Sequence, residues 1–188
     1  MPRPRSDDKR AAIMSAAARV IAAQGLGAAT ATIAKEAGVS NGSLFTYFDT
    51  KAHLLNQLYL DLKTDMGTAA LGGVPADRDV REQMLHMWSG WLRWASANPD
   101  KRRALAQLEV SDEITAPTHQ TASQALTGIA GILERSRENG PMRDAPLAFV
   151  VTLANALADA TIDFITGDPD HADAHRRAGF DALWRMIA

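Results

Sequence analysis

The segment 41–51 holds the side chains whose types and spacing suggest chemistry. Apolar residues separate its polar ones, which are Asn41, Ser43, Thr46, Tyr47 and Lys51. Amide and hydroxyl groups hydrogen-bond phosphate oxygens and base edges, and aromatic rings such as that of Phe45 pack against sugars and thymine methyl groups. Gly42 would let a second backbone approach closely. This combination indicates a nucleic-acid-binding surface.

Two short helices are needed to position this surface. Spacing and cap residues predict one helix from Thr30 to Ala37, with Thr30 as its N-cap, and another from about Asn41 to Phe48. The turn between them, Gly38-Val39-Ser40, has the length of a helix-turn-helix connection. The apolar side is expected to comprise Ile33, Ala34, Ala37, Val39, Leu44 and Phe48. Lys51 then stands at the start of the next helix, where it can neutralise a phosphate.

Helical periodicity continues along the chain, and no alternating β pattern competes with it. The first helix carries Ile13, Ala17, Val20 and Ile21 on one face and ends at Gly25 and Gly27. Further helices are predicted near 50–66, 78–97, 100–110, 118–138, 144–166 and 172–187. We therefore expect an all-α protein of about nine helices. The glycines and the proline within residues 67–77 mark the clearest boundary between domains.

Composition restricts the possible partners. The chain has 188 residues, of which 46% are apolar, and it has no cysteine, which excludes disulfides and thiolate metal sites. Its net charge is −2, yet residues 1–51 carry seven Lys and Arg against four Asp and Glu. A basic N-terminal quarter fits an anionic partner, although such a difference also arises by chance.

No membrane or secretory segment is expected. Residues 1–8 are polar and lack the apolar stretch of a secretory signal. The longest apolar segment, 146–167, is interrupted by Asn155, Asp159 and Asp163. We therefore expect it to be a buried helix of a cytoplasmic protein.

The run I-A-K-E-A-G-V-S-N-G-S-L-F-T-Y-F-D-T-K-A-H-L-L, residues 33–55, resembles the DNA-binding signature of TetR-family transcriptional regulators. The resemblance spans roughly residues 9–67. It implies a three-helix DNA-binding domain at 7–67, with the helix-turn-helix at about 30–49. A larger helical domain for ligand binding and dimerisation would follow at 76–188. It implies no catalytic activity and no cofactor.

The resemblance also implies which residues touch DNA: Thr30, Asn41, Gly42, Ser43, Phe45, Thr46, Tyr47 and Lys51. Asn41 stands where the family often has Lys, Arg or Gln, which should weaken the charge contribution and alter base choice. Phe45 replaces a usual tyrosine, and Ala29 a common threonine. The N-terminal Arg3, Arg5, Lys9 and Arg10 could contact the DNA backbone or form a solvated tail.

The same resemblance implies a homodimer whose last two helices pair with those of a second copy. The segment 144–166 supports this independently, because it is apolar on two sides, more than one core face requires. Burial inside a single domain is the alternative. A two-fold dimer would bind a near-palindromic DNA operator.

A ligand cavity in the C-terminal domain is likewise implied. Its candidate residues are Met84, Met87, Trp88, Trp91, Trp94, Asp159 and Asp163. The tryptophans and methionines would form an adaptable apolar wall, but ordinary core is an equally good reading. Both aspartates fit a solvated stripe as well. The function expected is a repressor released from its operator by a small, largely apolar effector.

Other functions remain open at this point. A DNA-binding regulator without a small-molecule switch would need only the N-terminal domain and a dimer. A helical interaction module or an enzyme is a more remote alternative. His171 and His175, with Asp170 and Asp173 beside them, could ligate a metal, but a solvated helix start is favoured because no H-E-x-x-H pattern exists.

Overall fold

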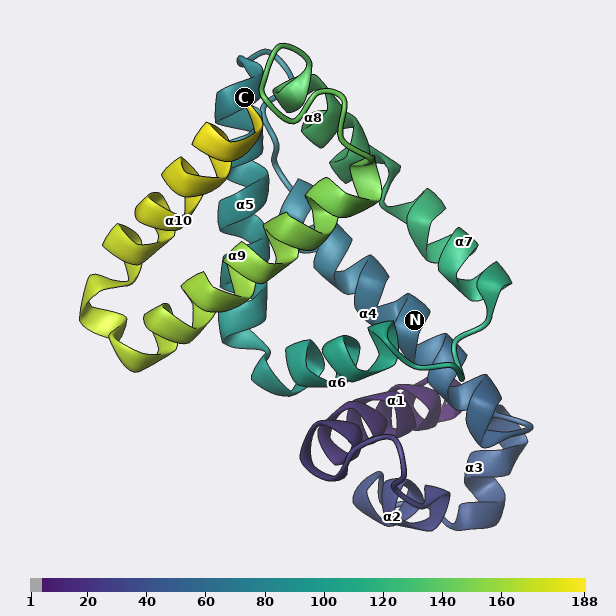
Figure 1. Ribbon diagram of the computed structural model, residues 1–188. Helices are drawn as coiled ribbons and strands as arrows, with labels where there is room; N and C mark the ends of the chain where they lie inside the picture. The colour runs from purple at the N-terminus through teal and green to yellow at the C-terminus, as the bar shows by residue number, and fades with distance from the viewer. Residues whose placement is uncertain (1–4) are drawn as a thin grey trace. The chain divides into compact units, whose positions relative to one another are not determined.

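The protein is described by a computed structural model that covers residues 5–188. It contains ten α-helices and one short 3-10 helix (Figure 1). Their bounds are α1 (Arg5–Gln24), α2 (Thr30–Glu36), α3 (Asn41–Tyr47), α4 (Lys51–Leu71), α5 (Val80–Ala97), α6 (Pro99–Glu109), α7 (Ala116–Ala125), α8 (Thr127–Arg137), α9 (Leu147–Gly167), η1 (Pro169–His171) and α10 (Ala172–Ile187). Over these residues no strand occurs, so the predicted all-α class is confirmed.

The chain divides into two compact units. The first contains the residues up to Thr64 together with Asn98–Gln124, and the second contains Asp65–Ala97 and Ala125–Ala188. Helices α6 and α7 therefore pack with the N-terminal helices, although they follow the boundary expected at 67–77. The division of the chain into a DNA-binding domain at 7–67 and a ligand-binding and dimerisation domain at 76–188 stays a prediction.

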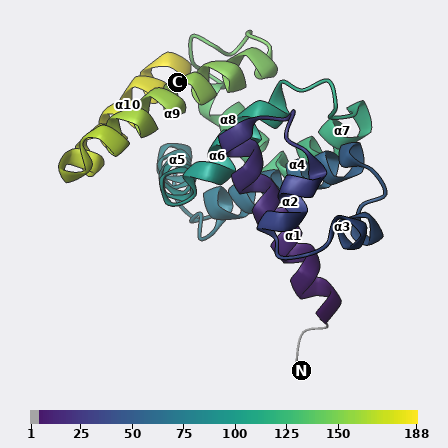
Figure 2. The ribbon, with the colours of Figure 1, turned by 90° about the horizontal axis from the view of Figure 1, so that it is seen from below.

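In the first unit, α1 packs against α2 and α6, and α2 packs against α3 (Figure 2). The predicted apolar face of α1 is confirmed, since Ile13, Ala17, Val20 and Ile21 are all buried. A polar bond adds to the packing of α6, where Gln107 Nε2 donates to the Ile21 carbonyl at 3.1 Å. This carbonyl lies in the last turn of α1 and also accepts from the Gly25 N–H at 2.9 Å, so two bonds secure the end of the helix.

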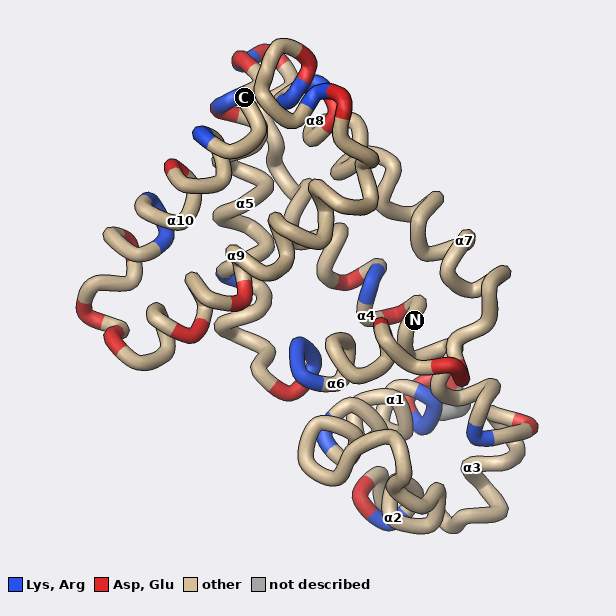
Figure 3. The backbone as a smooth tube through the Cα atoms, in the orientation of Figure 1, with Lys and Arg blue, Asp and Glu red and all other residues tan. Residues whose placement is uncertain are grey.

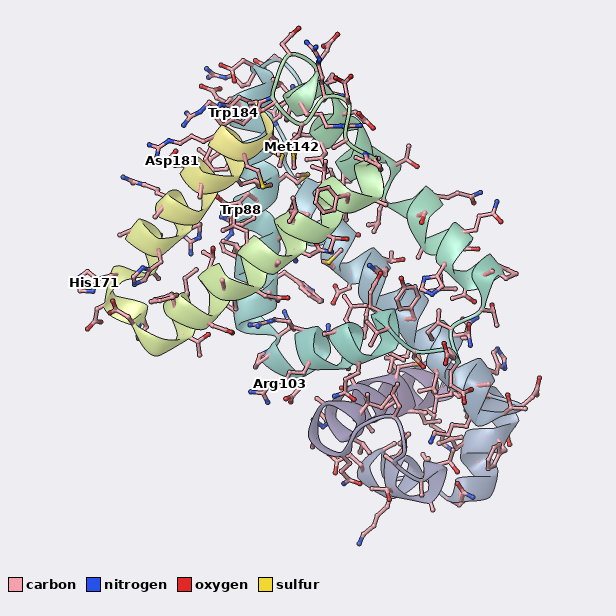
Figure 4. All side chains as sticks on the ribbon, viewed as in Figure 1. Trp88, Arg103, Met142, His171, Asp181 and Trp184 are labelled. Atoms are coloured by element: carbon pink, nitrogen blue, oxygen red, sulfur yellow. The ribbon has the colours of Figure 1, made fainter. Side chains whose placement is uncertain are left out.

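In the second unit, α5 packs against α8, α9 and α10. The indole of Trp88 on α5 donates to the Arg176 carbonyl of α10 at 3.1 Å. Gly179 permits α10 to lie close to both α9 and α5, because a Cβ there would lie 2.4 Å from Thr161 Oγ1 and 3.1 Å from Trp88 Cζ2. Asp181 and Trp184 come from the same helix (Figure 4), and Arg81 of α5 binds Asp181.

The segment predicted as one helix at 118–138 forms two, α7 and α8, separated at Leu126. The reason is tertiary packing around two glycines. A Cβ on Gly67 would lie 2.5 Å from the Leu126 side chain, and one on Gly128 would lie 2.9 Å from that of Leu71. The end of α4 therefore fits closely against this break, a contact that periodicity does not reveal.

A buried arginine fixes the connection from α8 to α9. Arg137 Nη1 donates to the carbonyls of Met142, Arg143 and Ala145 at 2.7, 3.0 and 2.6 Å. Its other guanidinium nitrogens bind Glu134, and this bond holds the pKa of the Glu134 carboxyl below its ordinary value. The start of α9 is thereby held against the end of α8.

Helix α9 has two different apolar faces. Its core face is buried and comprises Val150, Ala154, Ala158, Thr161, Ile162 and Ile165. Phe149 and Phe164 lie on another side and are 52% and 68% exposed. By length and composition alone α9 is apolar enough to cross a membrane, but core helices of soluble proteins pass the same test. The expectation of a buried helix therefore holds for one face only.

Candidate nucleic-acid interface

The turn between α2 and α3 has a geometry that specifies its glycine. Gly38 has φ +69°, in the left-handed region that other residues avoid. Its N–H donates to the Lys35 carbonyl at 3.1 Å, and the Val39 N–H donates to the Ala34 carbonyl at 3.0 Å. These two bonds form a Schellman motif, which ends α2 and fixes the direction of the chain.

Ser40 then starts α3 immediately. Its backbone is extended, and its Oγ accepts a hydrogen bond from the Ser43 N–H at 3.1 Å. This is the N-cap arrangement, which stabilises a helix by about 1 kcal/mol. Only residues 37–40 thus separate α2 from α3, a short connection of the kind that the predicted helix-turn-helix requires.

Two buried side chains anchor α3. Leu44 and Phe48 are 0% and 1% exposed, as predicted for core positions. The edge of the His53 ring lies against Phe48, and the Arg10 guanidinium lies over it at 5.6 Å from the ring centroid. Because residues four apart share one side of a helix, these anchors orient the rest of α3 outward.

Arg10 does not belong to a free N-terminal arm. It lies within α1, bonds Gln57 of α4 at 3.4 Å and pairs with Asp61 at 3.6 Å. The expectation that Arg10 could reach DNA as part of an arm is therefore corrected: it holds α1 to α4 across Phe48. Lys9 is exposed, whereas Arg3 and the Arg5 side chain lie outside the described residues.

The outward side of α3 gathers the residues expected to touch DNA. Asn41, Gly42, Phe45 and Thr46 are exposed, and Ser43 and Tyr47 are partly exposed. Thr46 Oγ1 donates to the Gly42 carbonyl at 3.2 Å. The arrangement brings together on one short helix all six residues that the sequence singled out there.

Lys51 lies at the first position of α4, as predicted, but it has a partner that the sequence did not suggest. Its Nζ donates to the Leu26 carbonyl at 2.6 Å. Leu26 belongs to the loop between α1 and α2, so Lys51 ties that loop to the start of α4. An ammonium has three N–H donors, which leaves capacity for a phosphate.

Thr30 is not the N-cap of α2. The cap residue is Ala29, which has extended backbone and no side chain able to accept a hydrogen bond. Thr30 is the first residue within the helix and is partly exposed. The prediction was wrong by one position because Thr30 itself adopts helical backbone angles.

A polar cluster in the same unit was missing from the sequence analysis. Tyr59 Oη lies 3.2 Å from Glu109 Oε2 and 3.1 Å from His119 Nδ1, and Lys63 Nζ lies 2.6 Å from the same Glu109 oxygen. A carboxylate only accepts and a phenol has one proton, so Tyr59 donates to Glu109 and His119 donates to Tyr59. The cluster links α4 with α6 and α7. Only the spacing of Tyr59 and Lys63, four apart, hinted at it.

The environment of Tyr59 changes its titration. Burial raises the pKa of Tyr59 above its ordinary value of 10.0, and the negative charge of Glu109 raises it further. The neutral phenol is therefore the form that the folded protein stabilises.

The residues proposed for a ligand cavity fall into two groups. Met84, Met87, Trp88 and Trp94 on α5 are buried, and Trp91 is partly exposed with its ring edge-on to Trp88. Asp159 and Asp163 lie exposed on α9. Both buried tryptophans have partners for their N–H groups, because Trp94 Nε1 donates to Asp65 Oδ2 at 3.1 Å. Whether the α5 residues line a cavity stays a prediction.

The histidines near the start of α10 bind a carboxylate other than those expected. His171 Nδ1 and His175 Nε2 each lie 2.9 Å from an Asp168 oxygen, at the turn between α9 and α10 (Figure 4). These bonds hold the pKa of Asp168 below its ordinary value. Within residues 5–188, no group of three or more histidine and acidic side chains is arranged to hold a metal.

These features define a helix-turn-helix DNA-binding protein. The family described as "Bacterial regulatory proteins, tetR family" matches residues 13–58. A protein from Shewanella sp. PV-4 described as a TetR-family transcription regulator is 28% identical, with a TM-score of 0.82 over 94% of this chain and 96% of that one. The chain therefore carries the TetR-family DNA-binding region and is similar over nearly its whole length to a TetR-family transcription regulator.

Two more distant structures share the fold. A TetR-family transcription regulator from Marinobacter aquaeolei VT8 is 22% identical and has a TM-score of 0.86 over 96% of this chain and 95% of that one. The regulator FadR from Bacillus subtilis, solved with stearoyl-CoA, is 18% identical and has a TM-score of 0.70 over 95% of this chain and 99% of that one. All three similar proteins are described as transcription regulators, not as enzymes.

The raised pKa of Tyr59 predicts a specific loss of stability in alkali. A raised folded-state pKa stabilises the protein below the unfolded value of about 10, and this stabilisation is lost as pH rises toward the folded-state value. We expect Tyr59→Phe to unfold at lower urea than the wild type at pH 8, and the difference to shrink above pH 10. If the difference in urea midpoint between the two proteins stays constant from pH 8 to 11, the raised pKa of Tyr59 is contradicted.

Proposed function

We propose that this regulator is a homodimeric repressor that binds a near-palindromic operator through α3 and leaves it when a small, largely apolar effector binds. The observation that supports the DNA-binding role of α3 is that one side is buried and the other is exposed. Leu44 and Phe48 lie in the core, whereas Asn41, Phe45 and Thr46 face solvent. Such a helix presents a polar and aromatic surface of a size that enters the major groove. In this proposal residues 7–67 bind DNA, and residues 76–188 bind the effector and dimerise.

The roles within the interface follow from chemistry and position. Asn41, Gly42, Phe45 and Thr46 would meet base edges, and Ser43, Tyr47 and Lys51 would hold phosphates or sugars. Thr30 would contact the backbone from the start of α2. Phosphate contacts fix register and supply affinity without sequence information, whereas base contacts supply specificity.

The dimer is supported by α9. Solvent-exposed phenylalanines at 52% and 68% are unusual on a helix whose opposite side is already buried. Phe149, Leu153, Ala156, Ala160 and Phe164 follow helical spacing along one stripe. A second copy that packs against this stripe and α10 would cover both rings, and an isologous contact of this kind gives two-fold symmetry. The two α3 helices would then meet half-sites about 34–36 Å apart, or a multiple of that distance.

The effector proposal rests on the apolar residues of α5. With their N–H groups bound inside the protein, Trp88 and Trp94 offer only apolar faces to a ligand. FadR from Bacillus subtilis, which shares the fold, was solved with stearoyl-CoA. The effector would act by binding more tightly to the conformation that fits the operator less well, since only differential affinity shifts an equilibrium. No chemical step is involved. We place the protein in the cytoplasm, where its DNA is found.

Substitution of Lys51 tests whether it holds a phosphate. We expect Lys51→Ala to weaken binding to all duplex sequences and to lower the slope of log affinity against log salt by about one unit. Fluorescence anisotropy at several salt concentrations measures both quantities. Arg143→Ala, which removes an exposed charge from the loop before α9, serves as the control and should leave the slope unchanged.

The alternative role of Lys51 gives a different result. If it only ties the α1–α2 loop through Leu26, Lys51→Ala will lower the melting temperature and the affinity while the salt slope stays at the wild-type value. That outcome would contradict the phosphate contact.

A charge on the exposed stripe of α9 tests the dimer. We expect Phe164→Glu to give monomers, because a carboxylate would be buried without a partner in the interface. Light scattering after gel filtration measures the mass. Asn155→Glu adds the same charge to the polar side of α9 and should remain dimeric. A dimeric Phe164→Glu protein would exclude this stripe as the interface.

A thermal-shift screen tests the effector. Fatty acids, their coenzyme A esters and planar aromatic compounds are the appropriate set, because the α5 residues are apolar and aromatic. A compound at 100 times its dissociation constant stabilises the fold by about 2.7 kcal/mol. We expect at least one compound both to raise the melting temperature and to release operator DNA. If none does, a regulator controlled by a partner protein, or not controlled at all, becomes the better reading.

A further inference from the structure

The DNA-facing helix α3 carries no charged residue along its whole length (Figure 3). This matters for base choice, because guanine is read in the major groove mainly by bidentate arginine or lysine. The lysines of the neighbouring helices, Lys35 and Lys51, lie outside α3, and Lys51 is already bonded to Leu26. Helix α3 therefore lacks the side chains that recognise guanine best.

Asn41 has an unused hydrogen-bonding group. The capping role at the start of α3 belongs to Ser40, whose Oγ accepts from Ser43 N–H. The Asn41 carboxamide is consequently not needed as a cap and lies exposed at the first position of the helix. A carboxamide has one acceptor and two donor hydrogens, which match N6 and N7 of adenine in the major groove.

Thr46 offers the groove mainly its methyl group. Its hydroxyl proton is committed to the Gly42 carbonyl, at 3.2 Å, one turn earlier. Phe45 beside it is 39% exposed and has no polar atom. Apolar groups of this kind contact the methyl group of thymine, which projects into the major groove.

We propose that α3 reads A·T base pairs: Asn41 binds the N6 and N7 edge of an adenine, and Phe45 and Thr46 contact thymine methyl groups. This inference rests on the proposed insertion of α3 into the major groove and adds the class of base that it recognises there. The operator half-site is therefore rich in A·T at the positions that α3 covers. Positive charge for phosphate binding must come from residues outside α3.

The experiment begins with selection of bound fragments from random duplex DNA by the full-length protein. Adenines of the selected half-site are then replaced one at a time by 7-deazaadenine, which lacks the N7 acceptor, and thymines by deoxyuridine, which lacks the methyl group. We expect one 7-deazaadenine to weaken wild-type binding by roughly 5- to 150-fold, the range for a bidentate base contact. A critical deoxyuridine should weaken it by about fourfold, the value of one buried methyl-sized group.

Matched variants assign each effect to a side chain. Asn41→Ala should bind the normal and the 7-deazaadenine operators equally, because the contact is already lost. Thr46→Val keeps the methyl group and should retain the preference for thymine over deoxyuridine. Thr46→Ser keeps the hydroxyl group and should lose its part of that preference.

The outcomes separate this inference from the function on which it rests. A selected half-site of G·C pairs, or a 7-deazaadenine penalty that persists in Asn41→Ala, would overturn the base assignment while leaving DNA recognition intact. Failure to select any sequence, with wild-type and Lys51→Ala proteins binding DNA alike, would overturn the proposed function itself.

Discussion

The burial of Leu44 and Phe48 is the constraint on which the rest of the DNA-binding unit depends. These two side chains, four residues apart, hold α3 against the core and leave its other side in solvent. Every residue expected to meet a base lies on that other side. Arg10 covers Phe48 and bonds to α4, so the anchor is itself held by two helices. Loss of either anchor would let α3 rotate, and recognition requires a fixed orientation.

Local hydrogen bonds, together with the buried anchors, fix the position of α3. The Schellman motif at Gly38 ends α2, and the Ser40 cap starts α3 one residue after Val39. The Schellman motif and the N-cap use only backbone groups and the Ser40 hydroxyl. The side chains of Asn41 and Phe45 therefore take no part in forming the turn. Helix α3 itself carries no charged residue, and in the proposed interface flanking residues such as Lys51 would supply the positive charge.

Much of this could be predicted from the sequence, because the governing signals are local. Gly38, the turn length and the apolar spacing of Leu44 and Phe48 specify the helix-turn-helix without reference to distant residues. The signals that failed are tertiary. Nothing near Lys51 in the sequence indicates the Leu26 carbonyl as its partner. The break at Leu126 arises from contact with the end of α4, and the Tyr59–Glu109–His119 cluster joins residues fifty or more positions apart.

Site-directed cross-linking shows directly whether the outward face of α3 lies in the major groove of the operator. The chain has no cysteine, so Thr46→Cys creates a single thiol without further engineering. Selected operator DNA would carry a disulfide-tethered thiol on either the major-groove or the minor-groove edge of one base. If α3 lies in the major groove, the Thr46→Cys protein will cross-link only to the major-groove tether, and Thr166→Cys on α9 will cross-link to neither. Reaction with the minor-groove tether, or equal reaction of both variants, would contradict the placement of α3 in the major groove.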